Sequence, residues 1–136
     1  MNEIKTTKFF DAGKAIFTVH NNKNEHFTYK IRKGKDNKPY FVFLLTGPDN
    51  STSYTYIGCY IPQQFCLKLT AKSKLLNDSR PVKVFNWAIK TVAENKELPV
   101  GYGIKHENKC CRCGRRLTTP ESIDHGIGPE CIKYIS

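Results

Sequence analysis

The residues that can do chemistry are concentrated in one short stretch of this sequence. Residues 106–131, HENKCCRCGRRLTTPESIDHGIGPEC, hold four of the chain's six cysteines and two of its four histidines. Cys110 and Cys113 form a CxxC pair that is followed by Gly114. Two thiolates on such a turn can point at one ion, because the glycine lets the backbone fold back on itself. The pattern predicts a zinc knuckle.

The rest of the zinc shell must come from residues outside the CxxC pair. Cys131 is the expected third ligand, because a thiolate in the first turn of a helix is favoured by the helix dipole. His106 can turn back onto the ion, and His125 can reach it from the loop before Cys131. Cys111 is the neighbour of a ligand and is expected to point away. Spacing alone does not separate the two histidines as fourth ligand.

The segment HxxxCxxCGRxLTxPESIxxGxGPxC resembles the C-terminal zinc-finger-like part of an uncharacterised family of small proteins encoded mainly by bacteriophages. The stretches FTYKIR (27–32) and FVFLLTGPDNSTSYTYIG (41–58), together with the helix around Phe85 and Trp87, resemble the same family's N-terminal region. The resemblance implies that His106, rather than His125, is the fourth zinc ligand. It implies no particular activity.

A catalytic role for the metal is not expected. Catalytic zinc keeps an open position, usually beside a carboxylate, and Glu107 and Glu130 are the adjacent carboxylates here. The order of ligands differs from the HxE and PCxxC motifs of nucleobase deaminases, and HENKC has only the first half of an HExxH motif. An open site with three protein ligands remains the alternative to a closed, structural one.

Basic and aromatic residues predict a surface that binds nucleic acid. Tyr54, Tyr56 and Tyr60 have the same parity on a strand, so they are expected to share a face on which bases can stack. The predicted contacts are Lys30, Arg32, Lys33, Lys35, Tyr54, Tyr56, Arg112, Arg115 and Arg116. In the alternative interpretation the tyrosines pack in the core and the arginines pair with nearby carboxylates.

The sequence predicts that a sheet followed by one helix positions these residues. Strands are predicted at AIFTVH (15–20), EHFTYKI (25–31), PYFVFLL (39–45), YTYIGCYI (54–61) and, with the weakest pattern, FCLKLT (65–70). The first two form a hairpin, the third is expected to be covered on both faces, and TGPDN (46–50) is expected to form a turn.

The helix is predicted over about 80–95, with Asp78 or Ser79 as its cap and Pro81 in its first turn. Val82, Phe85, Ile89 and Val92 lie on one stripe, so this helix should pack on the sheet, with Trp87 at the margin of the stripe. The predicted fold class is α+β: an antiparallel β-meander of four or five strands with one packed helix, plus a small C-terminal zinc-knuckle module. The predicted domains are residues 1–100 and 101–136.

Composition limits the partners. The formal net charge is +10, spread along the chain. Such a field attracts polyanions, so nucleic acid, single-stranded or structured, is the expected partner, with an acidic surface of a host protein as the alternative. No apolar run reaches the length of a membrane span and no signal peptide is recognisable, so we expect a soluble, cytoplasmic protein of the infected host cell, without a membrane partner.

Overall fold

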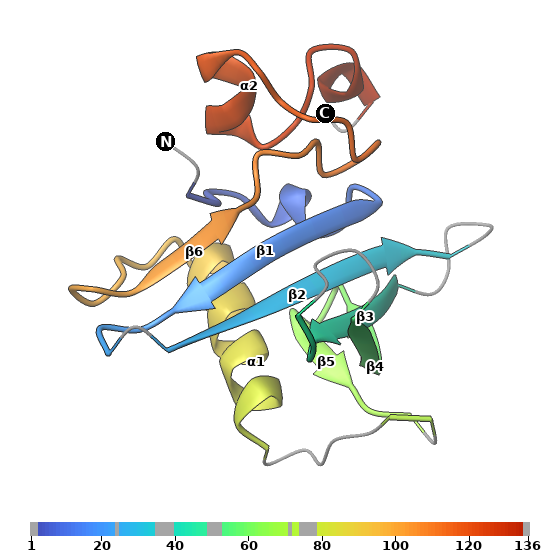
Figure 1. The fold of residues 1–136 in the computed structure, drawn as a ribbon, viewed down its shortest axis with the longest axis vertical. Coiled ribbons are helices and arrows are strands. Elements are labelled where there is room, and N and C mark those ends of the chain that lie inside the picture. Colours follow the sequence, from blue (N-terminus) through green and yellow to red (C-terminus); the bar gives the residue numbers. More distant parts are fainter. Residues whose placement is uncertain are drawn as a thin grey trace.

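The computed structural model describes residues 3–23, 25–34, 40–48, 53–70, 72–73 and 79–134. Its centre is a curled antiparallel sheet of six strands in the order β5-β4-β3-β2-β1-β6 (Figure 1). The strands are β1 (Lys14–His20), β2 (His26–Lys33), β3 (Tyr40–Leu45), β4 (Tyr54–Ile61), β5 (Cys66–Lys68) and β6 (Gly103–His106). The predicted meander is therefore confirmed over β1 to β5, and the sheet has one more strand than predicted.

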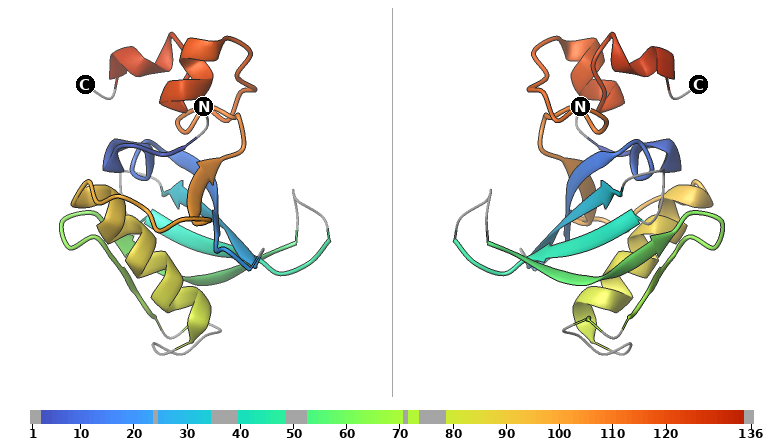
Figure 2. Two further views of the ribbon diagram at one scale, coloured as in Figure 1. Left: turned by 90° about the vertical axis from the view of Figure 1, so that its left-hand side faces the viewer. Right: turned by 90° about the vertical axis from the view of Figure 1, so that its right-hand side faces the viewer.

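Helix α1 (Arg80–Ala93) packs on one face of the sheet, as predicted. Its buried stripe includes Val82, Phe85 and Ile89, and the Phe85 ring lies 5.2 Å from that of Tyr29. The Tyr29 hydroxyl donates a hydrogen bond of 2.6 Å to the carbonyl oxygen of Pro81, which fixes the start of the helix on β2. Among the elements drawn in Figure 2, no helix lies against the opposite face of the sheet, which we call the open face.

Burial alternates along the central strands because only one face is covered. In β3, Val42 and Leu44 are buried, whereas Phe41, Phe43 and Leu45 of the opposite parity are half-buried. The prediction that β3 is covered on both faces is therefore wrong. The strand is central in the sheet, between β2 and β4, but its apolar outer side belongs to the open face.

A β-bulge in β4 changes which tyrosines share a face. Phe43 pairs with Tyr56 whereas Val42 pairs with Gly58, so Ile57 is an extra residue in the strand. Tyr56 then lies on the open face, but Tyr60 turns into the core, where it is only 2% exposed. The prediction that Tyr60 shares a face with Tyr54 and Tyr56 is wrong, because the extra residue reverses the alternation.

The C-terminal segment lies at one end of the sheet and contains α2 (Pro120–His125) and the 3₁₀ helix η3 (Cys131–Tyr134) (Figure 1). Close to it, the 3₁₀ helix η1 (Thr7–Phe9) precedes β1, and the backbone N–H of Lys14 donates to the carbonyl oxygen of Cys111 at 2.7 Å. The sheet continues through β6 to His106, so it extends past the predicted domain boundary at residue 100. Among the described residues no helix has the length and apolar character needed to cross a membrane.

Candidate metal centre

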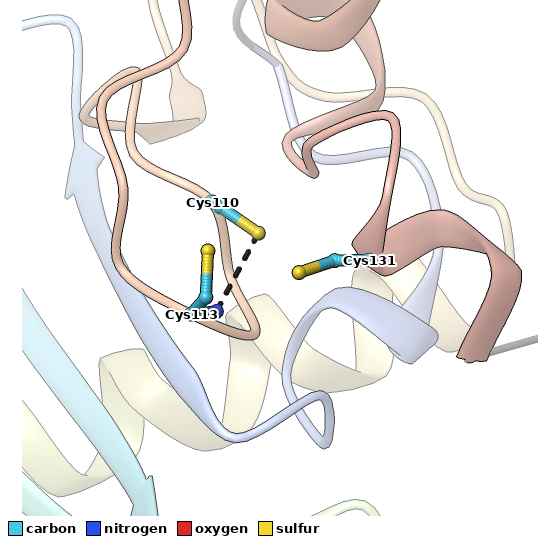
Figure 3. A group of neighbouring side chains, drawn as sticks. All are labelled: Cys110, Cys113 and Cys131. Atoms are coloured by element: carbon cyan, nitrogen blue, oxygen red, sulfur yellow. Dashed lines mark hydrogen bonds between the residues drawn. The ribbon is translucent and has the colours of Figure 1, made fainter.

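Three cysteines from the C-terminal segment converge on one point. The sulfur atoms of Cys110, Cys113 and Cys131 all lie within 4.8 Å of one another (Figure 3). Tetrahedral zinc, with Zn–S bonds of about 2.3 Å, places its sulfurs roughly 3.8 Å apart. The three side chains are therefore close enough to hold a metal ion, and the donor set is one that zinc accepts.

The knuckle is built by its own backbone. Gly114, at φ +80°, allows the turn, and its N–H donates to the carbonyl oxygen of Cys110 at 2.9 Å. The N–H of Cys110 in turn donates to the carbonyl oxygen of Arg115 at 2.8 Å. The N–H of Cys113 points at the Cys110 sulfur, 3.5 Å away (dashed line in Figure 3). These bonds hold both cysteines of the CxxC pair on the same side of the turn.

The environment lowers the pKa of the Cys110 thiol. Burial raises its pKa, but backbone N–H donors from Cys113, Gly128 and Arg112 outweigh this and bring the pKa down to about 7. Burial raises the pKa of Cys131, against a hydrogen bond from the Arg112 guanidinium, whose Nη1 lies 3.6 Å from the sulfur. Thiolate is the form that binds metal, so the backbone donors prepare Cys110 for this role.

His106, predicted as the fourth ligand, does not join the three cysteines. The residue is 2% exposed, and its Nδ1 accepts a hydrogen bond from the backbone N–H of Asn108 at 2.9 Å. Its Nε2 is hydrogen-bonded to the carbonyl oxygen of Ile123. Because both ring nitrogens are used, we replace the prediction with a structural role: His106 ties β6 to α2.

His125, the alternative fourth ligand, is exposed at the end of α2 and is likewise outside the group of metal-ligating atoms. Cys111 is 1% exposed, and burial raises the pKa of its thiol to about 12. Its N–H donates to the carbonyl oxygen of Gly126 at 3.0 Å. Within the described residues the centre therefore consists of three thiols, with no fourth protein ligand in the group.

The residues predicted to contact nucleic acid divide into separate places. Lys30 and Arg32 of β2 have the parity of the open face, as do Tyr54 and Tyr56 of β4. The Lys30 ammonium nitrogen lies 4.4 Å from the Tyr54 ring centroid and 5.2 Å from that of Phe43. The sheet therefore brings four of the predicted contacts together. Phe43 was not predicted, although its place in the alternation of residues 41–45 could have indicated it.

The other predicted contacts lie elsewhere. Lys33 has the opposite parity, and its ammonium nitrogen is 5.7 Å from the ring centroid of Tyr40. Arg112 lies with its guanidinium carbon 4.3 Å from the Tyr134 ring centroid. Arg115 and Arg116 line a hollow beside Cys110, Cys113 and Cys131. Lys35 falls outside the described residues, as do Asp78 of the predicted helix cap and residues 49–50 of the predicted turn.

Together, fold and site define a small α+β protein in which an antiparallel sheet with one helix carries a three-cysteine centre at its end. Residues 103–136 match the model of a family of unknown function, DUF6011. The match covers β6 and all three cysteines of the centre. No curated protein and no solved structure matches the chain.

Proposed function

We propose that the protein binds nucleic acid, single-stranded or structured, through the open face of its sheet, and that the three cysteines hold a structural zinc ion. The observation that carries the proposal is the position of Lys30 over the rings of Phe43 and Tyr54. A cation held among half-exposed aromatic rings can neutralise a phosphate while neighbouring rings stack on a base.

The rest of the open face supports this assignment. Phe41, Phe43 and Tyr56 form ring contacts with centroids 5.9 to 6.2 Å apart, so they present one continuous aromatic surface. Burial lowers the pKa of Lys30, and the neighbouring charge of Arg32 lowers it further. The neighbouring positive charges of Lys30 and Arg32 favour binding of a polyanion, because a phosphate backbone relieves their mutual repulsion.

Zinc is the metal that the donor set favours. When bound, zinc supplies rigidity to the turn and to η3, and structural zinc contributes on the order of 10 kcal/mol to the folding of such modules. The role of the chain's own residues is to align the three sulfurs and to keep Cys110 ionisable. Arg115 and Arg116 then add positive charge next to the centre.

In this proposal the protein is a small accessory protein of phage type, without catalytic activity, acting in the cytoplasm of the host cell. Docking on an acidic host protein is the rival function, because the net charge of +10 suits both partners. The aromatic open face favours nucleic acid over the rival, since stacked rings recognise bases as well as charge.

Fluorescence anisotropy with a labelled single-stranded oligonucleotide and a labelled hairpin tests the proposal. The affinity should fall steeply between low and moderate salt. Replacing Tyr54 with Ala should weaken binding roughly tenfold, since a stacked base is worth about 1–3 kcal/mol. Lys30→Gln should likewise weaken binding. Its matched control is Lys96→Gln, because Lys96 is exposed and pairs with Glu94 at 2.9 Å.

Two results would contradict the proposal. One is an absence of binding even at about 50 mM salt, where non-specific electrostatic binding is strong. The other is a host protein that the tagged protein captures from lysate after nuclease treatment, together with oligonucleotide affinities that Tyr54→Ala and Lys30→Gln leave unchanged. That pair of findings would support the rival.

A further inference from the structure

A groove separate from the open face lies between α1 and the β1–β2 hairpin. Its volume is about 340 Å³, and its walls include Phe27, Val84, Trp87 and Tyr102. Phe27 has the parity of the covered side of β2, so the groove opens on the side of the sheet that carries α1. Trp87, which the sequence places at the margin of the buried stripe, is 36% exposed here.

Aromatic rings shape the mouth of the groove. The rings of Trp87 and Tyr102 meet edge to face with centroids 5.8 Å apart, which fixes the orientation of the indole. Exposed indole held in this way offers a flat apolar surface of the size of a nucleobase. A base of a single strand can stack on such a surface whatever its sequence.

The charges around the groove are arranged unevenly. Arg80 donates to both carboxylate oxygens of Glu25, at 2.9 and 3.1 Å, and Asn21 donates to the same carboxylate at 2.8 Å. This pair is therefore neutral as a whole and held in place. Lys83 makes no ion pair with any of the described residues, so its charge is available to a ligand.

The exposed side of α1 extends this positive charge along the helix. Arg80, Lys83, Trp87 and Lys90 are its exposed residues, and they recur at helical spacing on one side. The segment Arg80–Ala93 contains no acidic residue. A tryptophan flanked by uncompensated lysines on one helix is complementary to a ligand that has both a base and phosphates.

We propose that this groove binds one nucleotide of a single-stranded nucleic acid, with the base on the Trp87 indole and the phosphate at Lys83. The inference rests on the proposed function for its class of ligand, but it uses a different surface. A single strand is the occupant that the charges favour, because Lys90 lies two helical turns from Lys83 and can meet a further phosphate of the same strand.

The chain offers a site-specific readout, since Trp87 is its only tryptophan. Titration with an oligothymidylate of about ten nucleotides, within the usual site sizes, should quench the tryptophan fluorescence and protect it from acrylamide. Lys83→Gln should weaken this response about five- to tenfold, and Lys83→Arg should largely restore it. Lys96→Gln, with the same loss of charge outside the groove, should leave it unchanged. Circular dichroism confirms that each variant is folded.

Anisotropy of the same oligonucleotide separates this inference from the proposed function. Quenching that survives Tyr54→Ala, while the total affinity falls, supports both sites. If the total affinity depends on Tyr54 but the oligonucleotide does not quench the fluorescence, the proposed groove site is overturned. The proposal for the open face is then still supported. If the oligonucleotide quenches the fluorescence and its total affinity is the same in Tyr54→Ala and Lys30→Gln as in the wild type, the groove is supported as a binding site. The open face is then refuted as one.

Two further ligands test the identity of the occupant. Polyglutamate carries the charge without bases, so quenching by polyglutamate equal to that by the oligonucleotide would overturn the proposal in favour of an acidic protein segment. Thymidine monophosphate should bind far more weakly than the strand. Equal affinity for the mononucleotide would overturn the assignment of a strand, and would indicate a free nucleotide instead.

Discussion

The imidazole of His106 accepts a hydrogen bond from the backbone N–H of Asn108 at 2.9 Å. Its Nε2 therefore carries the proton and donates to the carbonyl oxygen of Ile123. Burial lowers the pKa of His106, which keeps the ring neutral and suits this pattern of one acceptor and one donor. The ring also stacks on Phe9 at 5.9 Å. The side chain thus fastens the cysteine-rich segment to β6 and to the residues before β1.

Replacing His106 with Ala should destabilise the protein without removing a metal ligand. Loss of the side chain leaves the Asn108 N–H without its acceptor, at a cost of about 1–3 kcal/mol if this group stays buried. It also removes one hydrogen bond from the Ile123 carbonyl oxygen, which keeps the N–H of Gly126 at 3.3 Å. Thermal unfolding measures the loss, and elemental analysis measures the metal. His125→Ala is the matched control and should change neither quantity. A loss of metal in the folded His106→Ala protein would restore His106 as a ligand.

Replacing Cys110, Cys113 or Cys131 with Ser should abolish stoichiometric zinc, because each change removes one of the three thiols that converge within the described part of the chain. Elemental analysis of protein purified without chelator checks this. Cys59→Ser and Cys66→Ser are the controls, since these two cysteines lie on β4 and β5 and are outside the group of converging sulfurs. Wild-type protein with less than about half an equivalent of zinc would refute the site, because structural zinc is bound tightly.

The sequence predicted what depends on local pattern. The β1–β2 hairpin, α1 and the three cysteines follow from alternation, helical spacing and ligand spacing, and the structure has each of them. Strand β6 was missed because GIKH is short and pairs with β1, which lies more than eighty residues earlier in the chain. The role of His106 was missed because a buried imidazole and a metal-ligating one require the same residue type, and only tertiary contacts distinguish them.

The bulge in β4 could not be predicted from the local sequence pattern either, and a substitution of Gly58 tests it. Gly58 has φ +154°, and a Cβ atom there would lie 2.7 Å from the carbonyl oxygen of Lys68 on β5. Gly58→Ala should therefore destabilise the protein by more than about 1 kcal/mol, because alanine disfavours a positive φ and its Cβ atom would clash with a backbone oxygen of β5. Chemical denaturation measures the change. Gly114→Ala would strain the knuckle instead, so a comparison of zinc content separates the two effects.

Asp11 provides a prediction about pH. Its Oδ1 is buried and accepts no hydrogen bond within the described residues. Burial raises the pKa of Asp11 above its ordinary value of 3.8, against a lowering by its own backbone and by Lys33 and Lys8. A carboxyl whose pKa is raised on folding binds its proton more tightly in the folded state. Its ionisation therefore reduces stability as the pH rises through that raised value.

Asp11→Asn should consequently raise the melting temperature at pH 7, and the gain should shrink toward zero as the pH falls below 3.8, where both states of the wild type are protonated. Thermal unfolding of the wild type and of Asp11→Asn at several pH values measures the difference between their melting temperatures. The effects of the other acidic groups are common to both proteins and cancel in this difference. Asp124→Asn is the control of opposite sign, because Lys5 lies 3.2 Å from that carboxylate and lowers its pKa. A lower melting temperature for Asp11→Asn at pH 7 would mean that attraction to Lys33 and Lys8 outweighs the cost of burying the charge.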